Sequence, residues 1–407
     1  MPTPEELRAR GALAGYRVLE VGSTVAGPFC ARLFADFGAD VIKVEDVKGD
    51  PVRGLGEQHG GKSLYAASIF RNKSMIAADL RTEDGREIVR RLAQQSDVLV
   101  ENFKPGTLES WGLGYDALSA GNPGLVMVRI SGFGQSGPYS ERPGYGIIGE
   151  AISGLRHLVG DPDRPPARVA IPLTDYITGL YAAFGAMMAL RARDITGRGQ
   201  VVDTALYECA FSFTEPTIPG YEKTGAVAMR QGPRMPGSVP NSLYPTRDNA
   251  WLQIAAVSDG VFRKLAQAIG RADLTTHPDF ATAMARRTRP DEVDAIVSAW
   301  TRTMDARPAQ EHLLACGVPT AQVNTIADIF SDPHFAARGM LAAVPDDDLG
   351  TVTVSAPVPR LSDTPGALRK TGGQPGRDTA RVLRDTLGMA DAEIERLARA
   401  GAVKLGR

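Results

Sequence analysis

The sequence predicts an α/β fold built on a parallel sheet, and three observations carry this prediction. Short apolar segments with strand character lie within the first 130 residues, at 16–21, 40–45, 97–102 and 125–130. Segments with helical spacing separate them: Phe29, Leu33 and Phe37 recur every four residues, and a further helical pattern covers 84–95. Apolar strands that alternate with helices indicate a Rossmann-like parallel sheet covered on both faces.

The segment 131–174 is rich in glycine and proline and predicts a long loop. Loops of this length inside a compact domain usually serve a function. A strong amphipathic helix is expected over about 176–192, and Gly197 and Gly199 end it. Another element then begins with the residues VVDTAL.

The remaining chain indicates a second, smaller domain. Residues 214–243 are again rich in proline and glycine and are interpreted as a linker. We expect a small α+β domain over 244–330, a second linker over 331–345, and a return to the large domain over 346–407. The first part of the large domain is then 1–213. No internal repeat or low-complexity tract interrupts this plan.

Composition excludes several classes of protein. The 407 residues are 43% hydrophobic and 23% charged, with a net charge of −1 and no basic block, so no nucleic-acid surface is expected. Cys30, Cys209 and Cys316 form no CxxC or Cys/His cluster, so no metal site is expected. The polar, charged N-terminus is not a signal peptide and no apolar run reaches about 18 residues, which predicts a cytoplasmic protein without a membrane span.

Most motifs for known chemistry are missing. The turn after the first strand, Gly22–Gly27, is not GxGxxG, and the sequence has neither a Walker motif nor GxSxG. The five histidines have no metal-ligand spacing. A carboxylate nucleophile is the remaining option. The small-residue turn is equally compatible with anion binding and with a plain structural role.

Asp175 is the candidate nucleophile from position alone. It lies in Ile-Pro-Leu-Thr-Asp-Tyr, where the long loop meets the helix at about 176–192. A carboxylate in the first turn of a helix is also favoured by the helix dipole without any catalytic role. Taken by themselves, the residues favour this structural reading.

A resemblance to a known family over nearly the whole chain favours the catalytic role of Asp175 over the structural one. The segment 168–206, RVAIPLTDYITGLYAAFGAMMALRARDITGRGQVVDTAL, resembles the signature of the class III CoA-transferase family. Seven further segments occur in the order and spacing of the family. They are VLEVGSTVAGPFCARLFADFGADVIKVE, RNKSMIAADL, VENFKPGTLESWGLGYDAL, ISGFGQSGPYSERPGYG, PNSLYPTRDNAW, GVPTAQVNT and DPHFAARGM. The family also includes formyl-CoA transferase, carnitine CoA-transferase and α-methylacyl-CoA racemase types.

The resemblance implies roles for particular residues. Asp175 would be the nucleophile, passing through an anhydride and an aspartyl-CoA thioester. CoA would enter as a substrate, with no prosthetic group and no metal. CoA would contact the first strand–helix turn, the N-K-S region and the VENF segment. These regions carry over to Ser23, Thr24, Val25, Ala26, Arg71, Lys73, Asn102 and Phe103.

Two departures from the family pattern concern the CoA phosphates. Ser110 and Trp111 stand where relatives have a basic residue, and Asp46–Gly49 replaces a Pro-Gly-Gly. Lys48, Arg53 or Arg142 are expected to substitute for the lost contacts.

Tyr145 separates two branches of the family. The racemase branch has a histidine here, whereas an aromatic residue is similar to the transferase branch, in which it lines the thioester pocket. His157, 12 residues later, does not replace that histidine. Gly146 departs from the acidic residue often found next, and Glu150 is either a second carboxylate of the site or a helix surface residue.

Three readings of function stay open. The leading one is CoA transfer from an acyl-CoA, expected to be succinyl-CoA, to a free carboxylate such as a dicarboxylic acid. The second is intramolecular CoA transfer or a 2-methylacyl-CoA racemase. The third is a catalytically silent CoA-binding subunit. The resemblance also implies an interlocked homodimer.

The candidate acceptor contacts lie in the first predicted linker. Arg230 or Arg234 is expected to hold the distal carboxylate of a dicarboxylic acid. The stretch 232–241 is either a loop that covers the site or an inert linker.

Overall fold

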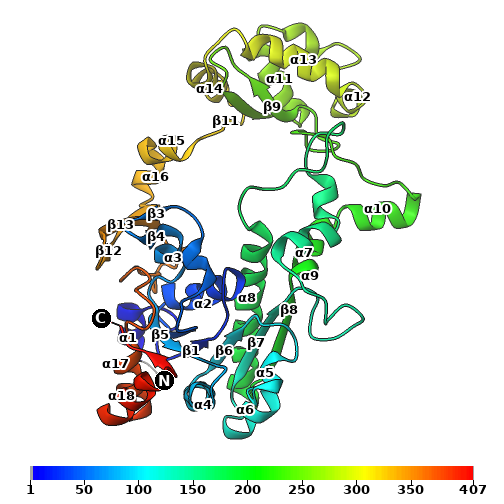
Figure 1. Ribbon diagram of the computed structural model, residues 1–407. Helices are drawn as coiled ribbons and strands as arrows, with labels where there is room; N and C mark the ends of the chain where they lie inside the picture. Colours follow the sequence, from blue (N-terminus) through cyan, green and yellow to red (C-terminus); the bar gives the residue numbers. More distant parts are fainter. Residues whose placement is uncertain (1–2, 407) are drawn as a thin grey trace. The chain divides into compact units, whose positions relative to one another are not determined.

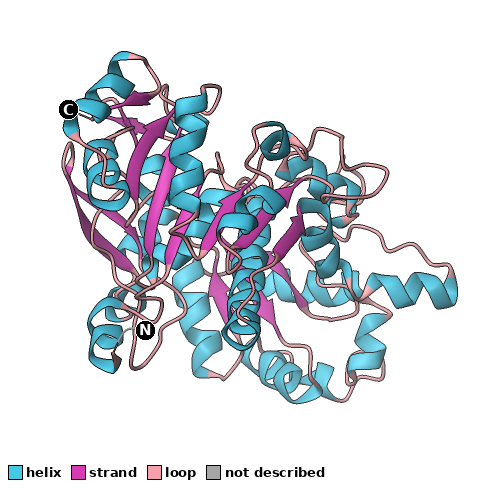
Figure 2. Cartoon of the chain, turned by 90° about the horizontal axis from the view of Figure 1, so that it is seen from below, coloured by secondary structure: helices cyan, strands magenta, loops and turns pink. Residues whose placement is uncertain are grey.

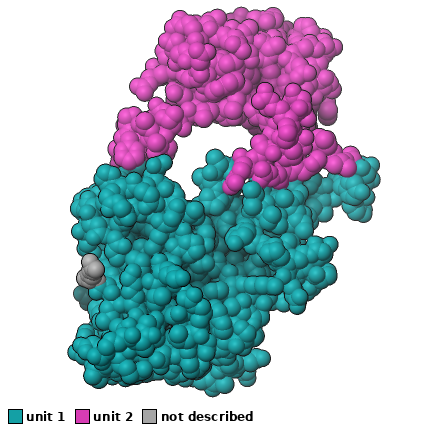
Figure 3. Space-filling model, viewed as in Figure 1, with its two compact units in different colours: residues 1–155, 169–225, 337–407 teal, residues 156–168, 226–336 magenta. Residues whose placement is uncertain are grey.

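The computed structural model describes residues 3–406 and divides the chain into two compact units (Figure 3). Unit 1 comprises residues 1–155, 169–225 and 337–407, and unit 2 comprises 156–168 and 226–336. Unit 2 is therefore wider than the expected small domain at 244–330. The predicted first linker contains a helix, α10 (Thr217–Thr224), and the second contains α16 (Pro333–Ala337) and most of β12 (Leu341–Asp346).

A seven-stranded sheet forms the centre of unit 1 (Figure 1). Its strands, in spatial order, are β14 (Val403–Lys404), β5 (Ser74–Ala78), β2 (Asp40–Glu45), β1 (Arg17–Glu20), β6 (Val98–Glu101), β7 (Val126–Ser131) and β8 (Val201–Ala205). All neighbouring pairs are parallel except β14 with β5. The α/β fold with a parallel sheet is thus confirmed, and each of the four strands predicted within the first 130 residues is present.

Helices cover both faces of this sheet (Figure 2). Alternate residues of the strands face opposite ways: Val18 packs with α2 and α8, whereas Leu19 packs in the core that contains α4, α17 and α18. The helices of unit 1 are α1 (Pro4–Arg10), α2 (Ala26–Asp36), α3 (Leu64–Ile69), α4 (Glu83–Ala93), α5 (Thr107–Ser110), α6 (Tyr115–Gly121), α7 (Gly146–Ile152), α8 (Leu173–Thr196), α9 (Leu206–Phe211), α10, α17 (Thr379–Leu387) and α18 (Asp391–Arg399).

The strand order reverses between β1 and β6. From β1 the chain adds β2 and β5 on one side, and it then crosses to add β6, β7 and β8 on the other. In sheets of this kind, ligands bind at the carboxyl ends of the strands beside such a reversal. The turns after β1 and β6 are therefore placed to form a site. Two short hairpins complete unit 1: β3 (Gln58–His59) with β4 (Lys62–Ser63), and β12 with β13 (Gly350–Ser355).

Unit 2 is a small α+β unit with its own core. An antiparallel sheet in the order β11-β10-β9 is packed with helices around Phe262, Leu265 and Val297. Its elements are β9 (Asn241–Pro245), β10 (Trp251–Ala255), α11 (Asp259–Ala268), α12 (Ala283–Arg287), α13 (Pro290–Thr301), α14 (Ala306–Ala315), β11 (Thr320–Gln322) and α15 (Ile326–Ser331). The strand predicted at 251–255 is β10.

Candidate active site

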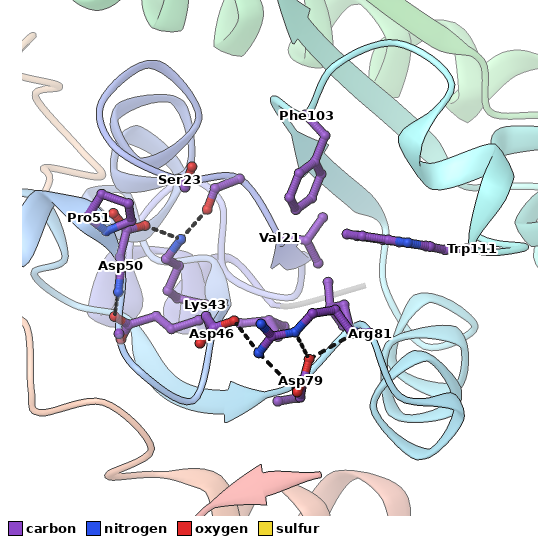
Figure 4. A pocket seen from close by; sticks show the side chains of 16 residues that line it. Val21, Ser23, Lys43, Asp46, Asp50, Pro51, Asp79, Arg81, Phe103 and Trp111 are labelled. Carbon is purple, nitrogen blue, oxygen red and sulfur yellow. Dashed lines mark hydrogen bonds and ion pairs between the residues drawn. The ribbon is translucent and has the colours of Figure 1, made fainter. Parts of the chain in front are cut away.

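A pocket of about 300 Å³ opens at the carboxyl edge of the large sheet, beside the reversal of strand order (Figure 4). The lining residues come from the carboxyl ends of β2 and β5 and from the segments that follow β1, β2, β5 and β6. They are Val21, Gly22, Ser23, Lys43, Val44, Glu45, Asp46, Gly49, Asp50, Pro51, Ala78, Asp79, Leu80, Arg81, Phe103 and Trp111. Of the predicted CoA contacts, Ser23 and Phe103 line this pocket. Phe103 meets Trp111 edge-on, with ring centroids 5.3 Å apart, and gives the pocket an aromatic wall.

Asn102 joins the turn after β1 to the end of β6. Its Oδ1 accepts the backbone N–H of Ser23 at 2.7 Å, and its Nδ2 donates to the Ser23 carbonyl at 2.9 Å. Two opposed hydrogen bonds to one residue fix both the position and the orientation of that peptide. The structure thus brings together two predicted site residues from strands on opposite sides of the reversal.

Thr24 holds a backbone conformation that is rare for a β-branched residue. Its φ is +67°, in the left-handed region. The backbone N–H of Thr24 donates to Asp50 Oδ1 at 3.0 Å, which holds the turn in this conformation. Val25 and Ala26 are buried and lead into α2. The turn is therefore set by contacts from outside itself.

A buried charge network supports Asp50 from below. Lys43 Nζ lies 3.0 Å from Asp50 and 3.2 Å from Glu20, and it donates to the Gly22 carbonyl. Burial opposes the charge on Lys43, but Glu20 and Asp50 outweigh it and raise the pKa of the amine. Burial would also raise the pKa of Asp50, yet Lys43 and the backbone N–H groups keep that pKa below its ordinary value. Both groups are thus held ionised beneath the turn.

The expectation that Arg71 and Lys73 meet CoA phosphates does not fit their positions. Arg71 is 1% exposed and donates to Asp36 from Nη2 at 2.6 Å and to the Ser355 carbonyl at 2.8 Å. Lys73 is fully buried, 2.6 Å from Glu20 and 2.7 Å from the Pro28 carbonyl. Burial lowers the pKa of Lys73 to about 8, with Glu20 opposing the shift. Both cations therefore form ion pairs inside unit 1.

The three basic residues expected to replace the lost phosphate contacts differ in whether their side chains are free to bind a ligand. Arg53 donates to Glu45 at 2.6 Å and to the Gly373 carbonyl, so its guanidinium is committed. Arg142 stacks on Tyr139, with its guanidinium carbon 3.5 Å from the ring centre. Lys48 is exposed beside the pocket. Sequence reasoning missed Arg81, which lines the pocket and is paired with Asp79 at its rim. The signal was its place just after β5, at the same edge of the sheet.

Asp175 lies in the first turn of α8, as its position in the sequence predicts. Its side chain is partly buried, and among residues 3–406 no ion pair to it is found. Burial raises the pKa of Asp175 to about 6. A desolvated carboxylate without an ion-pair partner has little bound water and no counter-ion to give up before it attacks. It is therefore a better nucleophile than a salt-bridged carboxylate.

Gly146 forms the floor against which the Asp175 carboxylate rests. A Cβ at position 146 would lie 2.0 Å from Asp175 Oδ2, so a side chain there would displace the carboxylate from this position. Tyr145, directly before it, is 73% exposed at the start of α7. Glu150 is buried in the same helix and is not a surface residue.

Two tyrosines that sequence reasoning missed stand next to Asp175. Tyr176 follows Asp175, and its hydroxyl lies 2.9 Å from the hydroxyl of Tyr65 on α3. Burial, this hydrogen bond and the negative charge of Asp175 raise the pKa of Tyr65. Phe29 packs edge-on against Tyr176 with ring centroids 4.8 Å apart. Only the position of Tyr176 beside Asp175 signalled this group in the sequence.

Asp175 and the turn after β1 are connected through two tightly packed helices. A Cβ at Gly179 would lie 2.7 Å from the carbonyl oxygen of Ala26 and 2.9 Å from Phe29, so α8 and α2 approach closely at this glycine. Gly179 is one helical turn after Asp175, and Ala26 is the first residue of α2. Asp175 and the turn are therefore held in one rigid arrangement.

The two arginines expected to bind a distal carboxylate already have partners in unit 2. Arg230 donates to the carbonyls of His157, Asp161 and Arg164 at 3.2 to 3.3 Å. Arg234 donates to Asp291 at 2.6 Å and also pairs with Asp294. The expectation that either guanidinium waits for a substrate does not fit these contacts.

Residues 3–406 contain neither a candidate metal cluster nor a helix suited to cross a membrane. No group of three or more His, Cys, Asp or Glu side chains in this range is arranged to hold a metal ion. No helix in this range is both long and apolar enough to span a membrane. The cysteines are unpaired thiols, with Cys30 and Cys209 buried.

Comparison with known proteins settles the family. The model of CoA-transferase family III matches residues 13–379. The chain belongs to this family. This CoA-transferase is 45% identical to the succinyl-CoA–D-citramalate CoA-transferase of Chloroflexus aurantiacus, an alignment that covers 95% of the chain and 96% of the relative. It is 40% identical to the beta subunit of the succinyl-CoA–L-malate CoA-transferase of the same organism, over 95% and 96% of the two chains.

The fold agrees with a solved relative. The crystal structure of a CAIB/BAIF family protein from Brucella suis superposes with a TM-score of 0.82 at 35% identity, over 92% of this chain and 98% of that one. CoA thioesters are the substrates of CoA-transferases, so this chain acts on a CoA thioester.

Proposed function

We propose that this CoA-transferase moves CoA from succinyl-CoA to a free dicarboxylic acid, with Asp175 as the covalent carrier. The observation that carries the proposal is the state of Asp175: a partly buried, unpaired carboxylate with a pKa of about 6 that lies directly against Gly146. The names of the relatives support the substrates, since citramalate and malate are both dicarboxylates that receive CoA from succinyl-CoA.

The reaction proceeds as two matched exchanges. An oxygen of Asp175 attacks the thioester carbonyl, the C–S bond breaks, and CoA thiolate departs. The product is a succinyl-aspartyl anhydride. The thiolate then attacks the aspartyl carbonyl, the anhydride C–O bond breaks, and succinate departs. The product is an aspartyl-CoA thioester. The acceptor carboxylate repeats both steps in reverse and regenerates Asp175. Each step exchanges one activated acyl group for another, so no intermediate is far downhill.

The environment of Asp175 suits both halves of this cycle. With a pKa of about 6 the carboxylate is mostly ionised at neutral pH and ready to attack. Its burial keeps water away from the anhydride, which hydrolysis would destroy. Tyr65 and Tyr176 supply hydroxyl groups beside the reacting carboxyl, where they can donate to an oxyanion.

The nucleotide end of CoA is assigned to the pocket at the carboxyl edge of the sheet. Ser23–Ala26 offers a pre-set backbone turn, and Phe103 with Trp111 offers an aromatic wall for the adenine. Arg81 at the rim pairs with Asp79 and Asp46, but its side chain is 60% exposed, and it is the proposed phosphate partner in place of Arg71 and Lys73. Lys48 is the second candidate, being exposed at the same edge.

A second copy of the chain is proposed to cover the outer face of α8. Leu180, Phe184 and Met188 recur every four residues along this helix and are 58%, 60% and 53% exposed. A stripe of large apolar side chains this long is unusual on a monomer surface. The interlocked homodimer stays a prediction that this face supports.

Trapping of the intermediate tests the proposal. The enzyme is incubated with succinyl-CoA, treated with hydroxylamine or borohydride, and measured by intact-protein and peptide mass spectrometry. Modification of the Asp175 peptide in the wild type but not in D175N, with unchanged affinity of D175N for free CoA, is expected. Retained CoA binding without an adduct from any acyl-CoA of a panel would instead indicate an isomerase or a silent subunit.

A further inference from the structure

Arg32 is a largely buried cation that lacks a hydrogen-bond partner. Its side chain is 14% exposed, and its Nε is buried without any partner among residues 3–406. The nearest carboxylate oxygen, Oδ2 of Asp36, lies 3.8 Å from that nitrogen, which is too far for a hydrogen bond. Buried donors are almost always satisfied, so an orphaned guanidinium nitrogen requires an explanation.

Asp36 lies at ion-pair distance from Arg32, but other donors already use both of its oxygens. Arg71 donates to both of its oxygens, from Nε at 2.9 Å and from Nη2 at 2.6 Å, and Asn72 donates from its side-chain amide at 3.1 Å. Two guanidinium groups thus share one carboxylate, and one positive charge is left uncompensated. Burial and Arg71 lower the pKa of Arg32 to about 10, so the group is still charged at neutral pH.

The uncompensated charge lies beside the nucleophile's own aromatic neighbours. The guanidinium carbon of Arg32 stands 4.4 Å from the ring centre of Phe29, and Phe29 packs edge-on against Tyr176. Tyr176 directly follows Asp175 and is hydrogen-bonded to Tyr65. Arg32, Phe29 and Tyr176 thus form a row of successive contacts that ends at the residue next to Asp175.

We propose that Arg32 binds the distal carboxylate of the dicarboxylic acyl group while the reacting carbonyl stands at Asp175. This inference rests on the proposed function and names the group that selects its substrate. Phe29 and Tyr176 would line the methylene chain between the two ends. A guanidinium binds a carboxylate through two parallel hydrogen bonds, and such bonds are strong where water is excluded. An acyl group without the second carboxylate would leave Arg32 unpaired.

The test compares two acyl-CoA thioesters of equal chain length on the full-length enzyme and on R32Q. Succinyl-CoA carries the distal carboxylate, and butyryl-CoA carries a methyl group in its place. The concentration of succinyl-CoA that half-saturates adduct formation at Asp175 is measured, together with the inhibition constant of butyryl-CoA and the dissociation constant of free CoA. R32Q is expected to raise the first value at least about tenfold and to leave the other two within about twofold.

Two further variants make the result specific. R32K keeps the charge but not the paired donors, and it is expected to restore part of the affinity for succinyl-CoA. R8Q removes an exposed arginine whose partner is Asp363 and should behave as wild type. Equal losses for succinyl-CoA, butyryl-CoA and free CoA in R32Q would overturn the proposal and make Arg32 a structural residue. An unchanged response to succinyl-CoA would overturn it as well.

The outcome is separable from that of the proposed function. If no adduct forms at Asp175 in the wild type, the covalent mechanism fails, and the binding constants of succinyl-CoA and butyryl-CoA still test Arg32. A change of oligomeric state in R32Q without a change in the ratio of those two constants would show that Arg32 meets a partner subunit, which also overturns the proposal.

Discussion

Gly146 and Asp175 are so close that a single methyl group at position 146 would overlap the carboxylate, since the ideal Cβ lies 2.0 Å from Oδ2. The glycine begins α7 and the aspartate lies in the first turn of α8. One consequence is geometric, because the carboxylate can approach the backbone of α7 directly. The other is chemical, because that approach removes water from the carboxyl group and contributes to its raised pKa.

G146A is expected to lower the rate of adduct formation by about 100-fold or more, because displacing a reacting group by about 1 Å costs this much. The rate is measured by quenching with succinyl-CoA and quantifying the modified Asp175 peptide. G260A is the matched control, because Gly260 lies in α11 and a Cβ there would meet only Arg263 Nη2, at 4.0 Å. Wild-type rates in G146A would mean that the site relaxes around the methyl group.

The pH dependence of adduct formation should follow the ionisation of Asp175. The attacking species is the carboxylate, so the rate should fall as the pH drops through about 6 and level off above about 7. Single-turnover measurements between pH 5 and 8 with succinyl-CoA test this. A rate that stays constant down to pH 5 would contradict a raised pKa.

The same pKa predicts a gain in stability for D175N. A carboxyl group with a folded-state pKa above its unfolded value stabilises the protein when protonated, and that contribution is lost as the pH rises through about 6. The gap between 3.8 and about 6 corresponds to at most about 3 kcal/mol. D175N should therefore melt at a higher temperature than wild type at pH 7.5, and the difference should vanish near pH 4. Equal melting temperatures at pH 7.5 would argue against a strained carboxylate.

The fold was predictable because its signals are local. Apolar runs such as 40–45 and 125–130 appear as β2 and β7 within one residue of the expected limits, and the helix predicted at 84–95 is α4. Hydrophobic periodicity fixes such elements without reference to the rest of the chain. The strand β5 was missed because its sequence, SMIAA, is short and rich in small residues.

The site was harder because sequence position does not specify burial or partners. Lys73 follows the motif for a phosphate contact, yet Glu20, 53 residues earlier, holds it in the core. Arg32 carries no motif, and only packing against Phe29 and the saturation of Asp36 give it significance. Asp175 was found because a resemblance spanning the chain outweighed its ambiguous position in the first turn of a helix.

Asn102 should control the affinity for CoA more than the chemical step. N102A removes both hydrogen bonds to Ser23, and the strained Thr24 turn then loses one of its supports. We expect the KM for succinyl-CoA to rise about tenfold with a smaller change in kcat. Steady-state kinetics at saturating acceptor provide both values. An equal fall in kcat with unchanged KM would place Asn102 in the chemistry instead.

The exposed stripe on α8 predicts how the protein assembles. F184D puts a charge into the middle of the stripe formed by Leu180, Phe184 and Met188, and a buried unpaired charge at an interface is strongly unfavourable. Size-exclusion chromatography with light scattering should show a dimer for wild type and a shift toward monomer for F184D. R399D, on the exposed side of α18, introduces an aspartate elsewhere and should leave the mass unchanged. A wild-type mass equal to that of one chain would contradict the homodimer, and a dimeric F184D would move its interface away from this helix.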